Sequence, residues 1–185
     1  MQTEKDKCRL GLLYDANNDP QLIAERQRIK QKCHEYNSLS PLRTQERETL
    51  LRDILGSTGK QFLIEQPFYC DYGYNIHLGE NFYSNVNLVI LDEAPVTFGS
   101  NVFIAPNCGF YTAGHPLETD IRNTGLEYAR PITVGDNVWI GANVCVLPGV
   151  TIGDNCTIGA GSVVVHDIPA NSLAVGNPCR VIRNI

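Results

Sequence analysis

The sequence predicts a mainly β fold, in which short parallel strands wind into a stacked triangular coil known as a β-helix. One observation behind this prediction is a strict period of six residues, and another is the glycine that usually follows the first residue of each six. An α-helix repeats its apolar stripe every 3.6 residues and a long strand alternates with a period of two, so neither explains the pattern. Three sixes make one coil, and stacked coils place the aliphatic residues in columns inside the prism. The first residues of the consecutive sixes are Val134, Ile140, Val146, Ile152, Ile158 and Val164, and four residues after each come Val138, Val144, Val150, Cys156, Ser162 and Ile168.

Residues 1–60 are predicted to form a separate helical segment. Asp19 is a suitable N-cap and Pro20 fits the first helical position, so a helix should begin there. Apolar residues follow at helical spacing until a proline ends the run. A second helix is expected over residues 44–55, with Gly56 as its stop.

Residues 61–185 are predicted to form the β-helix. The six-residue phase also holds upstream, except for one step of eight residues, which indicates a small insertion or bulge over residues 92–95. The phase lapses again over residues 113–131, a polar and charged stretch that we expect to leave the coil as a long loop. Such loops on a regular scaffold are commonly functional. The upstream residues in phase are Leu78, Ser84, Ile90, Phe98, Ile104 and Phe110.

Composition narrows the classes of function. Hydrophobic residues make up 43% of the chain, which is typical of a globular protein, and a net charge of -5 without any Lys/Arg cluster argues against a nucleic-acid partner. Neither an apolar run of roughly 18 residues nor a signal peptide is present, so we expect a cytoplasmic protein that does not enter a membrane. The seven cysteines are odd in number and never spaced Cys-x-x-Cys, which favours small buried residues over disulfides or a zinc site.

Several short motifs carry a more specific signal than the repeat. On these motifs, which span nearly the whole chain, the sequence resembles the maltose and galactoside O-acetyltransferases, within the larger group of hexapeptide acyltransferases. The resemblance implies a left-handed β-helix, although crossovers between parallel strands are usually right-handed. It also implies transfer of an acetyl group from acetyl-CoA to a hydroxyl of a sugar such as maltose, glucose or a galactoside, without a metal, by a homotrimer with active sites between neighbouring subunits. The motifs are Asp71-Tyr72-Gly73-Tyr74-Asn75-Ile76, Asn81-Phe82-Tyr83-Ser84-Asn85, Ala105-Pro106-Asn107, Gly114-His115-Pro116-Leu117, Val138-Trp139-Ile140-Gly141, Pro148-Gly149-Val150-Thr151-Ile152-Gly153 and Gly176-Asn177-Pro178-Cys179-Arg180.

Candidates for catalysis follow from the resemblance and from the residue types. Acyl transfer to an alcohol requires a base for the hydroxyl proton, donors for the oxyanion and a groove that orients the CoA. His115 stands at the start of the long loop and is predicted to be the base, because histidine titrates near neutral pH. Asn85 resembles the family's oxyanion-stabilising asparagine, with a backbone N–H near Ala142 as a second donor. Glu127 is a candidate to orient the imidazole, as a carboxylate does in hydrolase triads. The alternatives are that Asn85 is only a corner of the coil and Glu127 only a surface charge.

Further positions match the family's binding residues. Carboxylates and an amide would bind sugar hydroxyls, and a tyrosine would offer a ring face and a hydroxyl. Asp15 is an alternative to Asn17, because the alignment there can shift by a residue or two. The predicted acceptor-binding residues are Asn17, Asp71, Tyr83 and Glu93.

The predicted CoA channel combines a wall, small residues and a basic tail. Trp139, the only tryptophan, takes an outward position, and the resemblance implies that it walls the channel. The two arginines of the tail could hold the CoA phosphates, although a solvated tail is the alternative. At Val165-His166 the family commonly has Thr-Lys, which affects the expected affinity for CoA and not the reaction class. The predicted CoA-binding residues are Trp139, Ala142, Ala160, Val165, His166, Arg180 and Arg183.

Three other functions are alternatives to this one. A metal hydratase on the same fold needs three imidazoles brought together, and only His115 lies in a suitable loop. A non-catalytic β-helix scaffold needs neither a histidine at the base of a loop nor a basic tail. A related hexapeptide acetyltransferase that acts on an antibiotic or oligosaccharide hydroxyl stays open at the level of sequence.

Overall fold

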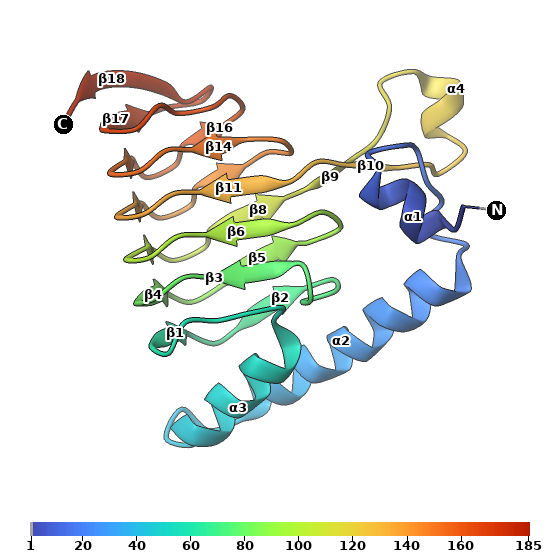
Figure 1. Cartoon of the computed structure of the whole chain (residues 1–185), viewed down its shortest axis with the longest axis horizontal. Coiled ribbons are helices and arrows are strands. Elements are labelled where there is room, and N and C mark those ends of the chain that lie inside the picture. The colour runs from blue at the N-terminus through green and yellow to red at the C-terminus, as the bar shows by residue number, and fades with distance from the viewer. Residues whose placement is uncertain (1) are drawn as a thin grey trace.

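The computed structural model, which describes residues 2–185, shows a chain that winds around a triangular prism and lays one short strand on each side at every turn (Figure 1). We call the three sides the first, second and third sheets, in the order in which the chain meets them. Successive coils pair in parallel, so each strand residue lies above its counterpart from the previous coil. The β-helix predicted from the six-residue period is therefore confirmed.

The strands are short because a corner follows every few residues. The first sheet contains β1 (Phe62–Ile64), β4 (Phe82–Ser84), β7 (Phe103–Ile104), β12 (Trp139–Ile140), β15 (Thr157–Ile158), β17 (Ser172–Val175) and β18 (Arg180–Asn184), the last of which is antiparallel to β17. The second contains β2 (Phe68–Cys70), β5 (Leu88–Leu91), β8 (Gly109–Tyr111), β13 (Cys145–Val146) and β16 (Val163–Val164). The third contains β3 (Ile76–Leu78), β6 (Val96–Phe98), β11 (Ile132–Val134) and β14 (Thr151–Ile152).

The core consists of columns of inward-facing side chains. Every hexad residue named above between Val134 and Ile168 is buried, and each aliphatic side chain so buried contributes about 1.5–3 kcal/mol relative to an exposed one. Ser162 is the polar exception, and its hydroxyl both donates to the Gly159 carbonyl and accepts from the Gly176 N–H. Its polar atoms are thus satisfied, as burial requires.

Asparagines make the corners regular. Asn81, Asn101 and Asn137 stand at the corner between the third and first sheets, all with a positive φ that asparagine tolerates better than most residues. Their side chains form a ladder, in which the amide of Asn81 donates to Asn101 over 2.9 Å and that of Asn101 donates to Asn137 over 3.0 Å. The Asn-containing turns of the sequence therefore link neighbouring coils as well as bending the chain.

Two helices cover the end of the prism where the first coil begins. Helix α2 (Pro20–Ser38) starts at Asp19, whose carboxylate accepts from the Leu22 N–H, and α3 (Thr44–Ile54) follows, both as expected. Ile29 and Leu51 join the core of the β-helix from these helices. Within residues 2–185, no helix combines the length and the apolar character needed to cross a membrane.

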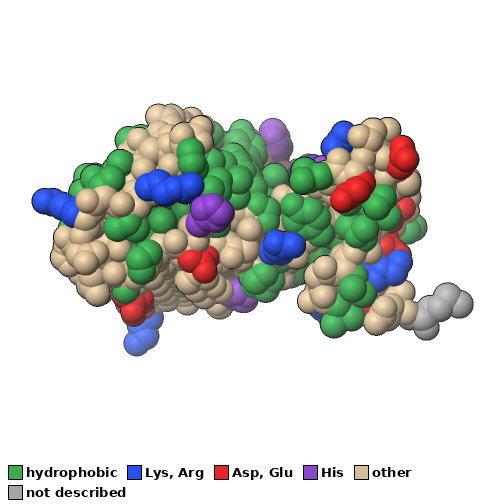
Figure 2. All heavy atoms as spheres, turned by 90° about the horizontal axis from the view of Figure 1, so that it is seen from above, with side chains coloured by type: hydrophobic (Ala, Val, Ile, Leu, Met, Phe, Trp, Pro, Cys, Tyr) green, Lys and Arg blue, Asp and Glu red, His purple; other side chains and the backbone are tan. Residues whose placement is uncertain are grey.

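A short helix and the long loop project from one side of the prism (Figure 1). Helix α1 (Glu4–Arg9) was not predicted, because six residues are too few to show a helical period. The chain between β8 and β11 contains β9 (Ala113–Gly114), α4 (Thr119–Arg122) and β10 (Tyr128–Ala129), with β9 and β10 antiparallel. Tyr14 pairs with Glu127 through two backbone hydrogen bonds of 3.0 Å, which join the N-terminal segment to the loop. Hydrophobic side chains gather at the narrow part of the molecule, between the prism and the projecting loop (Figure 2).

Candidate active site

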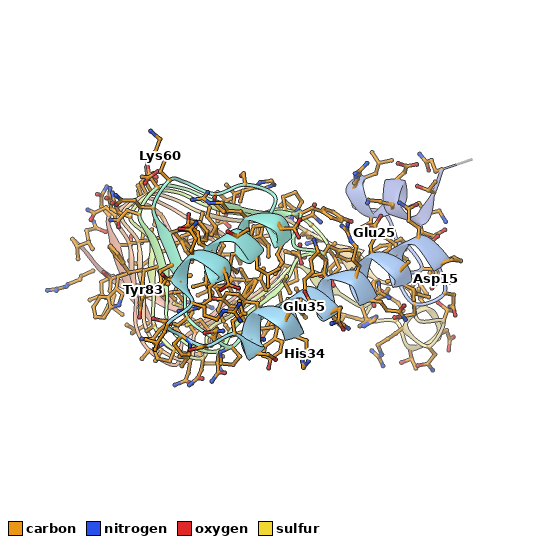
Figure 3. The ribbon with its side chains drawn as sticks, turned by 90° about the horizontal axis from the view of Figure 1, so that it is seen from below. Asp15, Glu25, His34, Glu35, Lys60 and Tyr83 are labelled. Carbon is orange, nitrogen blue, oxygen red and sulfur yellow. The ribbon has the colours of Figure 1, made fainter. Side chains whose placement is uncertain are left out.

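The predicted site residues lie along two edges of the prism. We call the corners between the first and second sheets the first edge, and those between the second and third sheets the second edge. The first edge carries Asn85, Ala142 and Ala160, beside the outward-facing Tyr83 and Trp139 of the first sheet. Figure 3 shows Tyr83 at the opposite end of the molecule from Asp15, which neighbours Asn17. The second edge carries Asp71, Glu93, His115, Glu127, Val165 and His166.

The imidazole of His115 is exposed and is held through one nitrogen. Its Nδ1 lies 3.1 Å from the carbonyl oxygen of Leu126 on the returning side of the loop. A carbonyl oxygen only accepts, so Nδ1 must carry the proton, and in the neutral ring Nε2 keeps its lone pair. The fold therefore presents His115 in the tautomer that a general base requires.

Glu127 is engaged elsewhere. Its carboxylate accepts hydrogen bonds from the Tyr14 hydroxyl over 3.2 Å and from the Asn17 side-chain amide over 3.4 Å. The structure thus gives the contact with the His115 Nδ1 to a backbone carbonyl one residue earlier, in place of the predicted carboxylate. Glu127 instead brings Asn17, a predicted acceptor residue, to the base of the loop.

Glu93 is a largely buried carboxylic acid with Asp71 as a neighbour. Burial raises the pKa of Glu93 to about 9, and the neighbouring Asp71 acts in the same direction. The local contacts agree, because the hydroxyl of Thr112 lies 2.8 Å from the Leu91 carbonyl and 3.2 Å from the Glu93 Oε2, and its single proton serves one of them at a time. At neutral pH Glu93 is therefore protonated and able to donate a hydrogen bond.

Asp92, to which no sequence motif points, supports the same corner. It is buried, and its Oδ1 accepts from the backbone N–H groups of Asp71 and Tyr72 over 3.0 and 2.8 Å. Burial raises its pKa to about 7. The predicted insertion over 92–95 was the available signal, since an extra polar residue at a corner of a packed coil needs a structural or chemical role.

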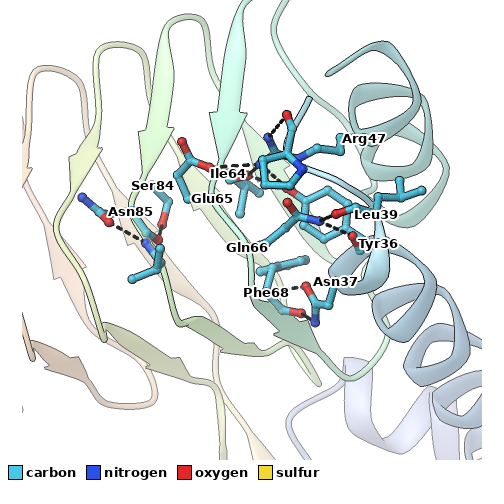
Figure 4. A network of polar contacts seen from close by, with 12 residues as sticks. Tyr36, Asn37, Leu39, Arg47, Ile64, Glu65, Gln66, Phe68, Ser84 and Asn85 are labelled. Carbon is cyan, nitrogen blue, oxygen red and sulfur yellow. Dashed lines mark hydrogen bonds and ion pairs between the residues drawn. The ribbon is translucent and has the colours of Figure 1, made fainter. Parts of the chain in front are cut away.

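Two potential oxyanion donors lie on the first edge. The Asn85 Oδ1 accepts from the Val86 N–H over 2.8 Å, which fixes the side-chain amide (Figure 4). Over residues 2–185, neither the Asn85 side-chain NH₂ nor the Ala142 backbone N–H has a protein acceptor. Next to Ala142, a Cβ on Gly141 would lie 2.6 Å from the Ala160 backbone nitrogen, so only glycine lets these coils stack this closely. The first edge thus offers donors beside small residues.

The outer faces of the three sheets differ in character. On the outer face of the first sheet, Phe103 pairs with Tyr83 of the strand before it and with Trp139 of the strand after it. The Phe103 side chain is 41% exposed and that of Trp139 is 58% exposed. On the second, the outward residues are also largely apolar, and Tyr69 is half exposed. The outward residues of the third sheet are polar: His77, Thr97, Thr133 and Thr151.

The remaining predicted CoA residues lie near the C-terminal end of the prism. Arg180 and Arg183 are exposed on β18, and Val165 and His166 form the last corner of the second edge. For metals, no group of His, Cys, Asp and Glu side chains in the described part of the chain could hold an ion.

Comparisons with known proteins agree on one family. Residues 7–59 match the pattern described as "Maltose acetyltransferase hexapeptide capping motif", and residues 131–166 match "Bacterial transferase hexapeptide (six repeats)". A Saccharomyces cerevisiae protein provisionally named an acetyltransferase is 59% identical over 95% of this chain and 89% of its own.

Solved structures extend the likeness to the whole chain. A maltose O-acetyltransferase from Clostridium difficile 630 superimposes with a TM-score of 0.98 at 50% identity, covering 100% of this chain and 98% of its own. A galactoside acetyltransferase in complex with coenzyme A superimposes with a TM-score of 0.97 at 45% identity, and the match covers 100% of this chain and 92% of its own. A Vibrio cholerae hexapeptide-repeat acetyltransferase with acetyl coenzyme A superimposes with a TM-score of 0.91 at 36% identity, and the match covers 99% of this chain and 98% of its own.

Proposed function

Because the chain belongs to the hexapeptide-repeat acetyltransferase family that includes the maltose and galactoside O-acetyltransferases, we propose that it moves an acetyl group from acetyl-CoA to a hydroxyl of a sugar such as maltose, glucose or a galactoside. The observation that carries this proposal is the tautomer of His115. Its Nδ1 is committed to the Leu126 carbonyl and its Nε2 is left to accept a hydroxyl proton.

The chemistry follows from the groups on the two edges. Nε2 of His115 takes the proton as the acceptor hydroxyl oxygen attacks the thioester carbonyl. The oxyanion that forms is stabilised by the Asn85 side-chain amide and the Ala142 N–H. As the tetrahedral intermediate collapses, the C–S bond breaks, and the imidazolium returns its proton to the departing thiolate of CoA.

This reaction requires two copies of the chain. His115 is on the second edge and Asn85 on the first, and the two edges of one prism point in different directions. A homotrimer in which the second edge of one subunit faces the first edge of the next would bring them together. The apolar outer faces of the first and second sheets support such contacts, and the polar third sheet would face solvent.

The acceptor and the cofactor would then occupy opposite ends of the same groove. Asn17, Asp71 and Glu93 of one subunit, with Tyr83 of its neighbour, would bind the sugar hydroxyls. Protonated Glu93 would act as donor and Asp71 as acceptor, which suits a hydroxyl that does both. The CoA would pass Trp139, Ala142 and Ala160 and reach Val165, His166, Arg180 and Arg183 with its phosphates.

The direct test is the rate of acetyl-CoA consumption with a panel of acceptors, measured by chromatography of the CoA released. Maltose, glucose and galactosides should be acetylated, and hydroxylated antibiotics should not. If the protein preferred an antibiotic, the proposed acetyl transfer would stand, and the proposed sugar acceptor would be wrong. If no hydroxyl compound raised consumption above the hydrolytic background, the proposal would be wrong.

A further inference from the structure

Two polar side chains are fully buried at the second edge, beside the predicted acceptor residues, and the proposed reaction does not use them. They are Asp92 and Thr112, each with an exposed fraction of 0%. Asp92 lies in the insertion after β5, directly before Glu93, and Thr112 follows β8 one coil later. Burying a polar group is costly unless it is hydrogen-bonded. The hydrogen bonds of these two side chains therefore show which parts of the edge they hold in place.

Asp92 holds the corner that carries Asp71. Its Oδ1 accepts from the backbone N–H groups of Asp71 and Tyr72 over 3.0 and 2.8 Å. Its backbone carbonyl accepts from the side-chain amide of Asn75 over 2.6 Å. These three bonds join the corner of one coil, residues 71–75, to the corner of the next coil, which carries Glu93. The position of Asp71 relative to Glu93 therefore depends on Asp92.

Thr112 holds Glu93 from the following coil. Its Oγ1 lies 3.2 Å from the Glu93 Oε2 and accepts from the Ala94 N–H over 3.0 Å. Its backbone carbonyl accepts from the Arg130 N–H over 2.9 Å, which closes the base of the loop that carries His115. Thr112 thus fixes one oxygen of the Glu93 carboxyl and ties this corner to the loop.

We infer that Asp92 and Thr112 are positioning residues for the acceptor, which hold the Asp71 and Glu93 carboxyls in the arrangement that binds a sugar. The inference rests on the proposed function, because it takes these two carboxyls to bind the acceptor. Neither positioning side chain touches the sugar, since no part of either is exposed. Their loss should therefore weaken binding of the acceptor and leave acetyl-CoA binding and the base unaffected.

The first test compares Thr112→Val with Thr112→Ser in the full-length protein. Valine has nearly the shape of threonine without the hydroxyl, whereas serine keeps the hydroxyl. The acceptor is maltose, glucose or a galactoside, whichever the unmodified protein acetylates fastest. The valine variant should raise the KM for this sugar about tenfold, because a misplaced carboxyl loses its hydrogen bonds to the sugar. The KM for acetyl-CoA and the kcat at saturating sugar should change less than about threefold, and serine should restore the sugar KM.

The second test makes the same comparison at Asp92. Asp92→Ala removes the oxygen that accepts both backbone N–H groups and should raise the sugar KM about tenfold, again with little change in the KM for acetyl-CoA. Asp92→Asn keeps an oxygen in the place of Oδ1 and should bind the sugar more tightly than the alanine variant. Thermal unfolding shows which variants are folded at the assay temperature. If Asp92→Ala does not fold, Thr112→Val decides the question.

The matched control is Glu80→Ala. The Glu80 carboxylate also accepts from two consecutive backbone N–H groups of the preceding coil, those of Lys60 and Gln61, each over 2.8 Å. It does so at a corner between the third and first sheets, away from the acceptor residues, so its loss should leave both KM values unchanged.

The outcomes separate this inference from the proposed function. An unchanged sugar KM in the folded Thr112→Val and Asp92→Ala variants would overturn the inference alone. Equal increases in the KM for sugar and for acetyl-CoA would also overturn it, because they would indicate a general loosening of the fold. If the unmodified protein acetylated no sugar, the proposed function would be wrong and the inference would fail with it.

Discussion

At the scale of single residues, the hydrogen bond between His115 and Leu126 makes catalysis by this imidazole testable. Replacing His115 with Ala removes the base and should lower kcat by about a hundredfold or more. The fold should be unchanged, since the side chain is exposed. His77→Gln is a suitable control, because His77 lies on the outer face of the third sheet and, within residues 2–185, its side chain bonds only to Ser57. Steady-state kinetics with acetyl-CoA measures both, and near-normal turnover of the His115 variant would remove it from the mechanism.

The protonated state of Glu93 leads to a prediction about stability. Its pKa is raised from 4.5 to about 9 in the folded protein, so the folded state binds a proton that the unfolded state releases above about pH 4.5. Stability from this group is therefore greatest in acid and is lost as the pH rises from about 5 to 9. In the variant Glu93→Gln, the side chain keeps the size and shape of glutamic acid but cannot ionise. Its Tm relative to the unmodified protein should rise steadily across that pH window, and a constant difference would show that Glu93 has an ordinary pKa.

The identity of most site residues could be predicted from sequence, but their contacts could not. His115 and Asn85 were identified by residue type and motif. The partner of His115 is a backbone carbonyl, which every residue possesses, so nothing in the sequence singles out Leu126. Glu127, with a carboxylate at a plausible distance along the chain, was the natural candidate, yet its side chain pairs with Tyr14 and Asn17. Such choices depend on how a loop folds back, and a pattern of residue types does not specify that.

At the scale of elements, the accuracy of prediction follows the strength of the local signal. The strands and corners repeat with one period, and α2 has both an N-cap and an N-terminal proline, so both were predicted. Helix α1 is six residues long, and its Thr3 and Asp6 cap is its main local signal. The pairing of β9 with β10 inside the loop involves two residues on each side, too few to show alternation. The handedness of the coil came from the resemblance alone, because the hexads are equally compatible with either hand.

Strand β18 carries the prediction about the cofactor. Changing Arg180 and Arg183 to Ala should raise the KM for acetyl-CoA about tenfold or more, since each loses a charge-assisted contact to phosphate. At saturating acetyl-CoA, kcat should change little, because neither residue reaches the reacting carbonyl in the proposed arrangement. With Val165-His166 in place of Thr-Lys, these arginines should carry a larger share of phosphate binding. Calorimetry with CoA, and with CoA that lacks its ribose phosphate, measures the effect. Unchanged binding of both ligands would place the nucleotide elsewhere.

At the scale of the whole molecule, the proposed site is divided between two edges of the prism. In this proposal the first edge supplies donors for the oxyanion, and the second supplies the base with a set of carboxyl groups. The faces beside the first edge are apolar, with Trp139 58% and Tyr69 50% exposed. Exposed apolar side chains beside the proposed site are typical of an interface between subunits. We therefore expect a cyclic trimer, whose mass by light scattering should be about three times the 20.5 kDa of the chain.

A mixing experiment tests the shared site more sharply than the mass does. His115→Ala and Asn85→Ala each remove one half of every site, and each alone should be nearly inactive, with Asn85→Ala lowering kcat roughly a hundredfold or more. If the two variants are unfolded together and refolded as mixed trimers, some sites combine an intact His115 with an intact Asn85 from a neighbour. Random assembly of equal amounts gives such sites about a quarter of the time, so activity should return to about a quarter of the unmodified level. Mixed trimers no more active than either variant alone would mean that each chain completes its own site, and the proposed arrangement of the two edges would be wrong.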